Sequence, residues 1–407
     1  MSSPTKVFFP GLNGLRFFAA FAVILTHVEL TKKLLGHGER LWIDASVELK
    51  TNAWNAIMDG TIRWQSPFVA AAGPHGVVFF FVLSGFLITY LLLEEKKVTG
   101  TIGIKKFYTR RILRIWPLYY IIVLLGFFVL PHLPWFDIAK QEVPFLQHFG
   151  INLLCYALLF PNLATAIFNS AVPNIGQAWS IGVEEQFYLI WPVLVKFFKN
   201  TLLAIAVFFL CVVALKVVFL LFFNDIAYAK IVSRFLATSK IETMAIGGLG
   251  AYLLYFKKEM IQKWVFSRAA QWLAYTCVPL VVLFAPVAFI NVVHLIYSVA
   301  FLIIILNVAA NPHSLLKFRS TWLHYLGKVS YGIYMYHIIC ITFSIYALDA
   351  IFGFAQRLEW WQSALVYLLS VALTLIVSSL SYEFIEKRFI NRKKKYTTVL
   401  SGDDAKA

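Results

Sequence analysis

Apolar runs of about 20 residues recur along most of the chain and are separated by short polar stretches. A helix needs roughly 20 apolar residues to cross the hydrocarbon core of a bilayer, so each run predicts a membrane-spanning helix. The runs lie at 11–30, 76–94, 114–131, 186–198, 202–222, 241–256, 269–286, 289–309, 329–350 and 363–384. The pattern predicts an all-α polytopic membrane protein with about ten transmembrane helices. We expect one membrane domain over 1–390 and a basic, disordered cytoplasmic tail over 391–407.

Basic residues gather in alternate loops, and this distribution predicts an orientation. Loops 95–113, 257–268 and 310–328 and the tail each carry at least three Lys or Arg residues. Cytoplasmic loops of membrane proteins collect these residues, so we expect both termini to be cytoplasmic. The long loop 31–75, which mixes both signs of charge, would then lie outside.

Two stretches do not fit this scheme. Residues 151–168 are apolar but broken by Pro161-Asn162, and a span there would place the later basic loops outside. We interpret them as a re-entrant or surface-lying segment, which is tolerated where protein buries the irregular backbone. The loop 223–240 carries three basic residues on the predicted outside and could belong to a ligand-facing wall.

Composition supports the membrane interpretation and excludes other classes. The chain is 60% hydrophobic and 14% charged, whereas soluble domains are nearer ~45–50% and ~25%. The net charge of +16 reflects topology, because no soluble domain is visible that could present it to nucleic acid. The four cysteines are scattered in apolar stretches without the spacing of metal ligands. The first apolar segment lacks the features of a cleavable signal peptide.

The first predicted helix carries two ionisable residues within its apolar sequence. Arg16 and His27 are eleven residues apart, which returns to almost the same helix face about 16 Å further along. Ionisable groups inside a membrane are costly and usually face a wet cavity or a functional path. The alternative is that Arg16 extends to the interface and His27 is a satisfied polar residue.

A second group of cations lies where the third predicted span begins. Arg111 and Arg114 are three positions apart, so they project to one side of a helix. Paired guanidinium groups match phosphate oxygens, although basic flanks at cytoplasmic helix ends are also common. Arg114 fits that alternative less well because it lies inside the apolar run.

Two adjacent carboxylates, Glu184 and Glu185, open the fourth predicted span from the outer side. They could cap the helix electrostatically, or orient an imidazole for proton transfer. Glu184 is expected at a depth similar to that of His27, which makes a His–carboxylate pair geometrically possible. Small residues such as Ser84 and Ser330 more often serve helix packing, and His337 is more often a core histidine than a cavity residue.

Six motifs in order resemble the membrane acyltransferase type 3 family. The first is the Arg16–His27 pair, separated by ten residues. The others are Phe-Phe-x-x-Ser-Gly at 80–85, Arg-x-x-Arg-Ile-x-Pro at 111–117, Trp-Ser-x-x-x-Glu-x-Gln-Phe-Tyr at 179–188, Gly-x-x-Ser-Tyr-x-x-Tyr at 327–334 and Ser-Tyr-x-Phe-Ile-Glu at 381–386. Each motif alone is weak, but together they cover nearly the whole chain. The chain departs from the usual Asp-Gly-Leu-Arg opening by having Asn13.

The resemblance implies a membrane-embedded O-acyltransferase that moves an acyl group, commonly acetyl from acetyl-CoA, onto a hydroxyl of a cell-surface or exported carbohydrate. The expected location is the plasma (inner) membrane. Acyl-CoA would be a co-substrate, with no bound cofactor, metal or nucleic acid. The rival hypothesis is a transporter or flippase of a lipid-linked sugar, although no inverted repeat is evident.

Each residue of the predicted site is assigned a role from its chemistry and from the motif that contains it. Arg16, Arg111 and Arg114 would bind acyl-CoA. His27 would be the general base or transient acyl carrier, assisted by Glu184. Further residues would bind the acceptor or line the cavity: Ser84, Trp179, Glu185, Tyr188, Ser330 and His337.

Overall fold

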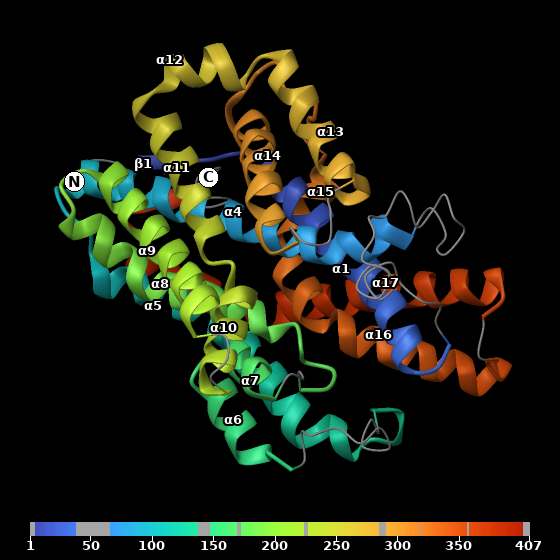
Figure 1. Cartoon of the computed structure of the whole chain (residues 1–407). Coiled ribbons are helices and arrows are strands. Elements are labelled where there is room, and N and C mark those ends of the chain that lie inside the picture. Colours follow the sequence, from blue (N-terminus) through green and yellow to red (C-terminus); the bar gives the residue numbers. More distant parts are fainter. Residues whose placement is uncertain are drawn as a thin grey trace.

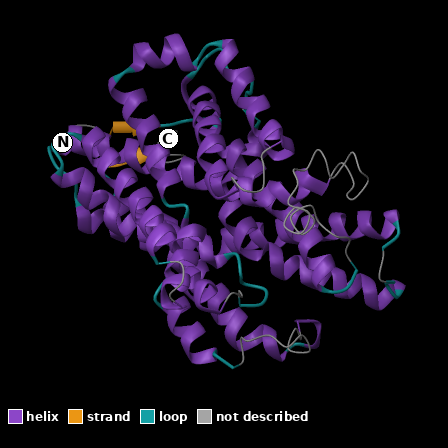
Figure 2. Cartoon of the chain, in the orientation of Figure 1, coloured by secondary structure: helices purple, strands orange, loops and turns teal. Residues whose placement is uncertain are grey.

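A computed structural model of the chain describes residues 5–37, 66–136, 147–168, 172–223, 227–284, 290–318, 320–355 and 358–401. Helices make up nearly all of these ranges, and two short strands form one small sheet (Figures 1 and 2).

The N-terminal half contains α4, the longest of the described helices. Its elements are β1 (Thr5–Val7), α1 (Leu12–Leu34), α4 (Ser66–Thr99), α5 (Ile104–Leu124), η1 (Leu125–Val129), η2 (Leu130–His132), η3 (Pro134–Phe136), α6 (Phe149–Ala157), α7 (Pro161–Phe168) and α8 (Ala178–Phe197). The C-terminal half adds α9 (Thr201–Phe222), α10 (Ala227–Ser239), α11 (Glu242–Phe256), α12 (Lys258–Met260), η5 (Ile261–Val265), α13 (Arg268–Phe284), α14 (Ile290–Ala310), α15 (Thr321–Lys328), α16 (Ser330–Phe352), α17 (Trp360–Ser381), η7 (Tyr382–Glu386), α18 (Lys387–Lys393), η8 (Lys394–Tyr396) and β2 (Val399–Ser401).

Within the described residues, seven helices are long and apolar enough to cross a membrane, or up to eight if one bent pair is a single span. The bent pair joins Lys258–Val265 to Arg268–Phe284 at 68°. The predicted runs 186–198 and 241–256 fall in α8 and α11, which are not among the seven. The chain is therefore helical and polytopic as predicted, whereas the count of about ten and the cytoplasmic termini stay predictions.

Helix α4 lies at the centre of the bundle and packs against α1, α8, α11 and α14 (Figure 1). Its contact with α11 is close because glycines face backbone across the interface. A Cβ atom at Gly85 would lie 1.9 Å from the carbonyl oxygen of Met244, and one at Gly247 would lie 2.0 Å from that of Val82. Small residues at such positions let helix backbones approach closely, which is how helices associate in membranes.

Helix α1 is held along its length by two other elements. Near its beginning, the Asn13 backbone lies against Gly327 of α15, where a Cβ atom would be 2.1 Å from the carbonyl oxygen. Near its end, the ring of His27 meets that of His337 on α16. Arg16 and His27 are therefore both placed inside the bundle by the packing of one helix.

The C-terminal segment, residues 387–401, includes the part of the expected disordered tail that the structure describes, residues 391–401. Residues 387–401 form α18, η8 and β2, and β2 pairs in parallel with β1 in the register Thr5 with Val399 (Figure 2). Arg110 ties this segment to the bundle by donating to the Tyr396 carbonyl at 2.9 Å and to Glu95 at 2.8 Å. Residues 402–407 lie outside the described residues.

The two stretches that did not fit the span scheme are built from short helices. Residues 151–168 cover most of α6, all of α7 and the break between these two helices. Leu159 lies in the break and has a φ of 64°. Helix α7 begins at Pro161, where the sequence predicted an interruption of the apolar run. The basic stretch 223–240 includes α10. Most of the mixed-charge loop 31–75 lies outside the described residues.

We predict that Gly85→Ala lowers the free energy of unfolding by about 1–3 kcal/mol, because the added methyl group meets backbone rather than a movable side chain. The measurement is the thermal unfolding midpoint of the purified protein in detergent. Gly150→Ala is the control, since a Cβ atom there has no atom within 4 Å. Equal midpoints for the two variants would contradict the tight α4–α11 contact.

Candidate functional site

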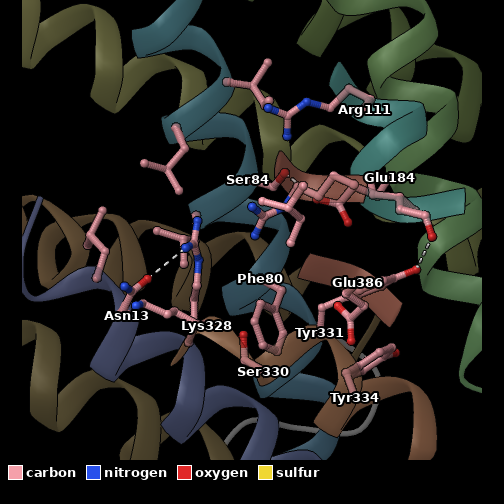
Figure 3. A pocket seen from close by; sticks show the side chains of 18 of the residues that line it. Asn13, Phe80, Ser84, Arg111, Glu184, Lys328, Ser330, Tyr331, Tyr334 and Glu386 are labelled. Atoms are coloured by element: carbon pink, nitrogen blue, oxygen red, sulfur yellow. Dashed lines mark hydrogen bonds between the residues drawn. The ribbon is translucent and has the colours of Figure 1, made fainter. Parts of the chain in front are cut away.

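A cavity of about 430 Å³ lies between α1, α4, α5, α8 and α16 (Figure 3). Residues of the C-terminal segment also line it. Seven basic and two acidic side chains line it, so its lining is strongly cationic. The basic residues are Arg16, Arg111, Arg114, Lys328, Lys387, Lys393 and Lys394, and the acidic residues are Glu184 and Glu386. The structure thus brings the three predicted arginines into one cavity although they come from two separate helices.

The two arginines of α5 have little compensation from protein groups. Arg111 packs over the rings of Phe107 and Tyr188 at 5.6 and 5.5 Å, and its Nε atom is buried without a hydrogen-bond partner. Within the described part of the chain, neither Arg111 nor Arg114 makes a side-chain hydrogen bond or ion pair. Both guanidinium groups therefore keep donors available to an anion in the cavity.

Arg16 has one neutral partner. It donates to Asn13 Oδ1 at 3.0 Å, and the Asn13 amide nitrogen lies 3.0 Å from His324 Nδ1. Asn13 therefore fixes the Arg16 side chain while leaving its charge uncompensated, which an aspartate at this position would not do.

The carboxylate of Glu184 faces the same cavity and is held by neighbours. It accepts hydrogen bonds from Ser84 Oγ at 2.5 Å and from the Tyr188 hydroxyl, one helical turn away on α8. Its charge interacts with those of Arg16 and Arg111. Across the cavity, Glu386 is close enough to Arg114 for their charges to interact. These carboxylates offset part of the charge of the three arginines.

The predicted base, His27, does not line this cavity. Its ring packs against that of His337 with centroids 4.8 Å apart, and the His337 ring lies 5.7 Å from that of Tyr334. Tyr334 does line the cavity and contacts Phe80 with a centroid distance of 6.0 Å. His337 therefore lies behind Tyr334, one aromatic side chain away from the cavity, and His27 lies beyond His337.

Hydrogen bonds define the tautomer of both histidines. His27 Nδ1 lies 2.9 Å from the Val23 carbonyl and His337 Nδ1 lies 2.6 Å from the Tyr334 carbonyl. A carbonyl only accepts, so each Nδ1 carries the hydrogen and each Nε2 keeps its lone pair when the ring is neutral. The Nε2 atom of His337 is buried and unpartnered. The pair can thus accept a proton from a hydroxyl.

The structure does not bring Glu184 to His27, although the sequence placed them at similar depth. Glu184 lies with Ser84, Tyr188 and Arg16, and His27 lies nearly three turns further along α1 from Arg16. The sequence analysis placed Glu184 at the beginning of a predicted span, whereas Glu184 lies inside α8, which begins at Ala178.

The remaining predicted residues divide into two groups. Ser84, Tyr188 and Ser330 line the cavity. Trp179, Glu185 and His337 are not among its lining residues. Trp179 packs against Phe81 at 6.2 Å, and Glu185 accepts a hydrogen bond from Trp116 Nε1 at 3.0 Å.

Several cavity residues were missed by sequence reasoning. Glu386 closes the last recognised motif and could have been found there, whereas Lys328, Lys393 and Lys394 looked like ordinary basic flanks. Outside the cavity, Glu242 binds Lys216 at 2.6 Å and His294 at 2.8 Å, an ion cluster that joins α9, α11 and α14. No group of side chains suited to holding a metal ion is found in the described residues.

The chain is similar to known proteins over nearly its whole length. Residues 9–383 match a family described as an acyltransferase domain. Over 402 residues the chain is 28% identical to the O-acetyltransferase OatA of Staphylococcus aureus strain NCTC 8325, covering 93% of this chain and 57% of the relative. It is 25% identical over 404 residues to a putative O-acetyltransferase of S. aureus strain COL, covering 94% and 57%. The chain thus spans a little over half the length of these relatives. No solved structure matches significantly.

We predict that the cavity is open to aqueous reagents. In a variant lacking the four native cysteines, Ser84→Cys should react rapidly with a small anionic thiol reagent because Ser84 lines the cationic cavity. Thr89→Cys is the control, since Thr89 lies on the same helix, is fully buried and binds Trp191. Equal labelling rates at the two positions would show that the cavity is closed or misplaced.

Proposed function

Because the chain belongs to the membrane acyltransferase type 3 family, we propose that it moves an acyl group, acetyl in the first instance, from cytoplasmic acyl-CoA to a hydroxyl of a cell-surface or exported carbohydrate. The relatives are O-acetyltransferases by name, which favours acetyl as the group and a hydroxyl oxygen as the acceptor atom.

The observation that carries the donor assignment is the pair Arg111 and Arg114. Two guanidinium groups in one cavity, without protein hydrogen-bond partners in the described residues, are costly unless an anion offsets them. Guanidinium groups bind phosphate oxygens through paired, charge-assisted hydrogen bonds. The phosphates of acyl-CoA supply such oxygens and carry the thioester at the end of a flexible arm.

The lining of the cavity also indicates the direction in which the thioester-bearing arm of acyl-CoA would extend. Its cationic lining lies beside the C-terminal segment, whereas Phe80 and Tyr334 line it on the side toward the histidines. An acyl group that passes these two rings would reach His337 and His27. The long separation of Arg16 from His27 on one helix matches this order of phosphate site and reaction site.

In the proposed reaction, His27 Nε2 accepts the proton of the acceptor hydroxyl while the oxygen attacks the thioester carbonyl carbon. The new C–O bond forms, the C–S bond breaks, and the CoA thiolate leaves with the proton that His27 returns. His337 lies against His27 and helps to hold its ring. The step needs no oxidant or metal.

Glu184 has a positioning role in this scheme instead of assisting His27 directly. Held by Ser84 and Tyr188, it keeps the side chains of Arg16 and Arg111 within the cavity through its charge. Loss of that charge would disturb donor binding more than the proton transfer.

The test separates binding from chemistry in protein purified in neutral detergent. Arg111→Gln should weaken acetyl-CoA binding by about 10- to 100-fold, since hydrogen bonds to charged groups contribute about 1.5–3 kcal/mol. Direct titration with acetyl-CoA measures the dissociation constant. Lys105→Gln is the control, because Lys105 is exposed on the same helix and does not line the cavity.

His27→Ala should lower the rate of acetyl transfer by about 10²- to 10⁴-fold and leave the dissociation constant for acetyl-CoA nearly unchanged. Acetyl release from radiolabelled acetyl-CoA, with and without carbohydrate acceptors, measures turnover. If the folded His27→Ala protein transfers acetyl at the wild-type rate, the proposed base is wrong. If wild-type protein neither binds nor consumes any acyl-CoA, the donor assignment fails.

A further inference from the structure

The segment 172–177, which leads into α8, is buried although it forms neither helix nor strand. Ile175 is fully buried, and Asn174 and Gln177 are only 6% and 2% exposed. Thr342 of α16 fixes the segment by donating to Asn174 Oδ1 at 2.9 Å. Irregular backbone among membrane-spanning helices is tolerated where protein buries it or where it lines a site, and its polar groups still need partners.

Gln177 has one side-chain atom without a partner. Its Nε2 atom donates to the Met335 carbonyl at 2.5 Å. Because a carbonyl only accepts, the amide nitrogen must face Met335, and this fixes the position of the amide oxygen as well. That oxygen, Oε1, is buried and receives no hydrogen bond from the described residues. A buried acceptor without a donor is unfavourable, so a ligand or water is expected to supply the donor.

A second buried atom without a partner lies close by. His337 Nδ1 is bound to the Tyr334 carbonyl at 2.6 Å, and His337 Nε2 has no partner in the described part of the chain. The carbonyls that hold His337 and Gln177 belong to consecutive residues of α16. Consecutive carbonyl groups of a helix lie only a few ångströms apart, so the two side chains are neighbours. Each of them offers a lone pair that the protein does not use.

Tyr334 separates these two side chains from the cationic cavity. Its hydroxyl lies 2.6 Å from Ser180 Oγ and donates to the Gln177 carbonyl oxygen at 3.2 Å. Tyr334 lines the cavity, whereas Gln177 and His337 do not. Gln177 is therefore placed on the side of the histidines, where the acceptor hydroxyl reacts, and not among the arginines of the donor site.

We propose that Gln177 is a specificity residue of the acceptor site. One hydroxyl of the acceptor approaches the histidine pair, and a neighbouring hydroxyl of the same molecule donates a hydrogen bond to Gln177 Oε1. This rests on the proposed function and narrows its acceptor to a carbohydrate with two neighbouring free hydroxyls. An acceptor with a single hydroxyl leaves Oε1 unpaired, and a site built around a hydrogen bond rejects molecules that cannot make it.

The first experiment compares two small acceptors, with acetyl-CoA as donor and protein purified in neutral detergent. Ethylene glycol carries two neighbouring hydroxyls, and one of them is masked in 2-methoxyethanol. For the wild type, kcat/KM per free hydroxyl should be about tenfold higher for the glycol than for the ether. Gln177→Leu should abolish this preference and leave the KM for acetyl-CoA unchanged.

Gln186→Leu is the matched control. Gln186 lies on the same helix and is fully paired with Asn162 through two hydrogen bonds of 2.9 and 3.1 Å. The Gln186→Leu protein should keep the wild-type preference for the glycol.

The second experiment does not depend on turnover and compares thermal unfolding midpoints in detergent. Gln177→Leu should leave the midpoint unchanged or raise it, because it removes an unpaired buried acceptor. Gln186→Leu should lower the midpoint, because it leaves the buried amide of Asn162 without its partner. A fall in Gln177→Leu as large as that in Gln186→Leu would show that Oε1 is satisfied within the protein, and would overturn the acceptor role.

The outcomes separate this inference from the proposed function. If acetyl-CoA is consumed but the wild type does not prefer the glycol, the role of Gln177 is wrong and the proposed function stands. An unchanged preference in Gln177→Leu, or an equal loss in Gln186→Leu, would overturn the role of Gln177 in the same way. If no protein consumes acetyl-CoA, the proposed function fails and the acceptor role fails with it.

Discussion

The structure depends on three guanidinium groups that are held inside a helical bundle with incomplete compensation. Burying a cation away from water costs several kcal/mol unless charges or hydrogen bonds replace its hydration. Arg16 has a neutral partner in Asn13, and Arg111 and Arg114 make no side-chain hydrogen bond or ion pair within the described residues. An anionic ligand therefore gains more from this cavity than from a fully paired one. We propose that this imbalance between buried cations and compensating protein groups is what makes the cavity an anion-binding site.

The fold distributes the parts of that site over distant segments. Helix α1 carries both a cavity cation and the histidine that lies beyond His337, so its packing against α15 and α16 fixes the distance between the two. Helix α4 supplies Ser84 and the glycine contact with α11. The pairing of β1 with β2 brings the last described residues to the cavity. The stability of the fold and the geometry of the proposed donor site thus depend on the same helix contacts.

Sequence reasoning predicted the helical membrane fold and the three arginines among the seven cavity cations, because apolar run length and charges inside such runs are local signals. It placed Glu184 with His27 by assuming that α8 begins at the carboxylates, whereas α8 begins at Ala178. It also treated Lys393 and Lys394 as parts of a loose tail. Strand pairing between residues almost 400 positions apart has no local signal in a chain of this composition. The packing of His27 against His337 could not be predicted either, because it joins two helices that are far apart in the sequence.

The most direct test is an experimental structure of the protein in a lipid nanodisc with acetyl-CoA. The account predicts density for the CoA phosphates at Arg111 and Arg114, with the acetyl group directed past Tyr334 toward His27. Lipid in the cavity, with acetyl-CoA absent or bound on another face, would contradict the claim that these buried cations form the donor site.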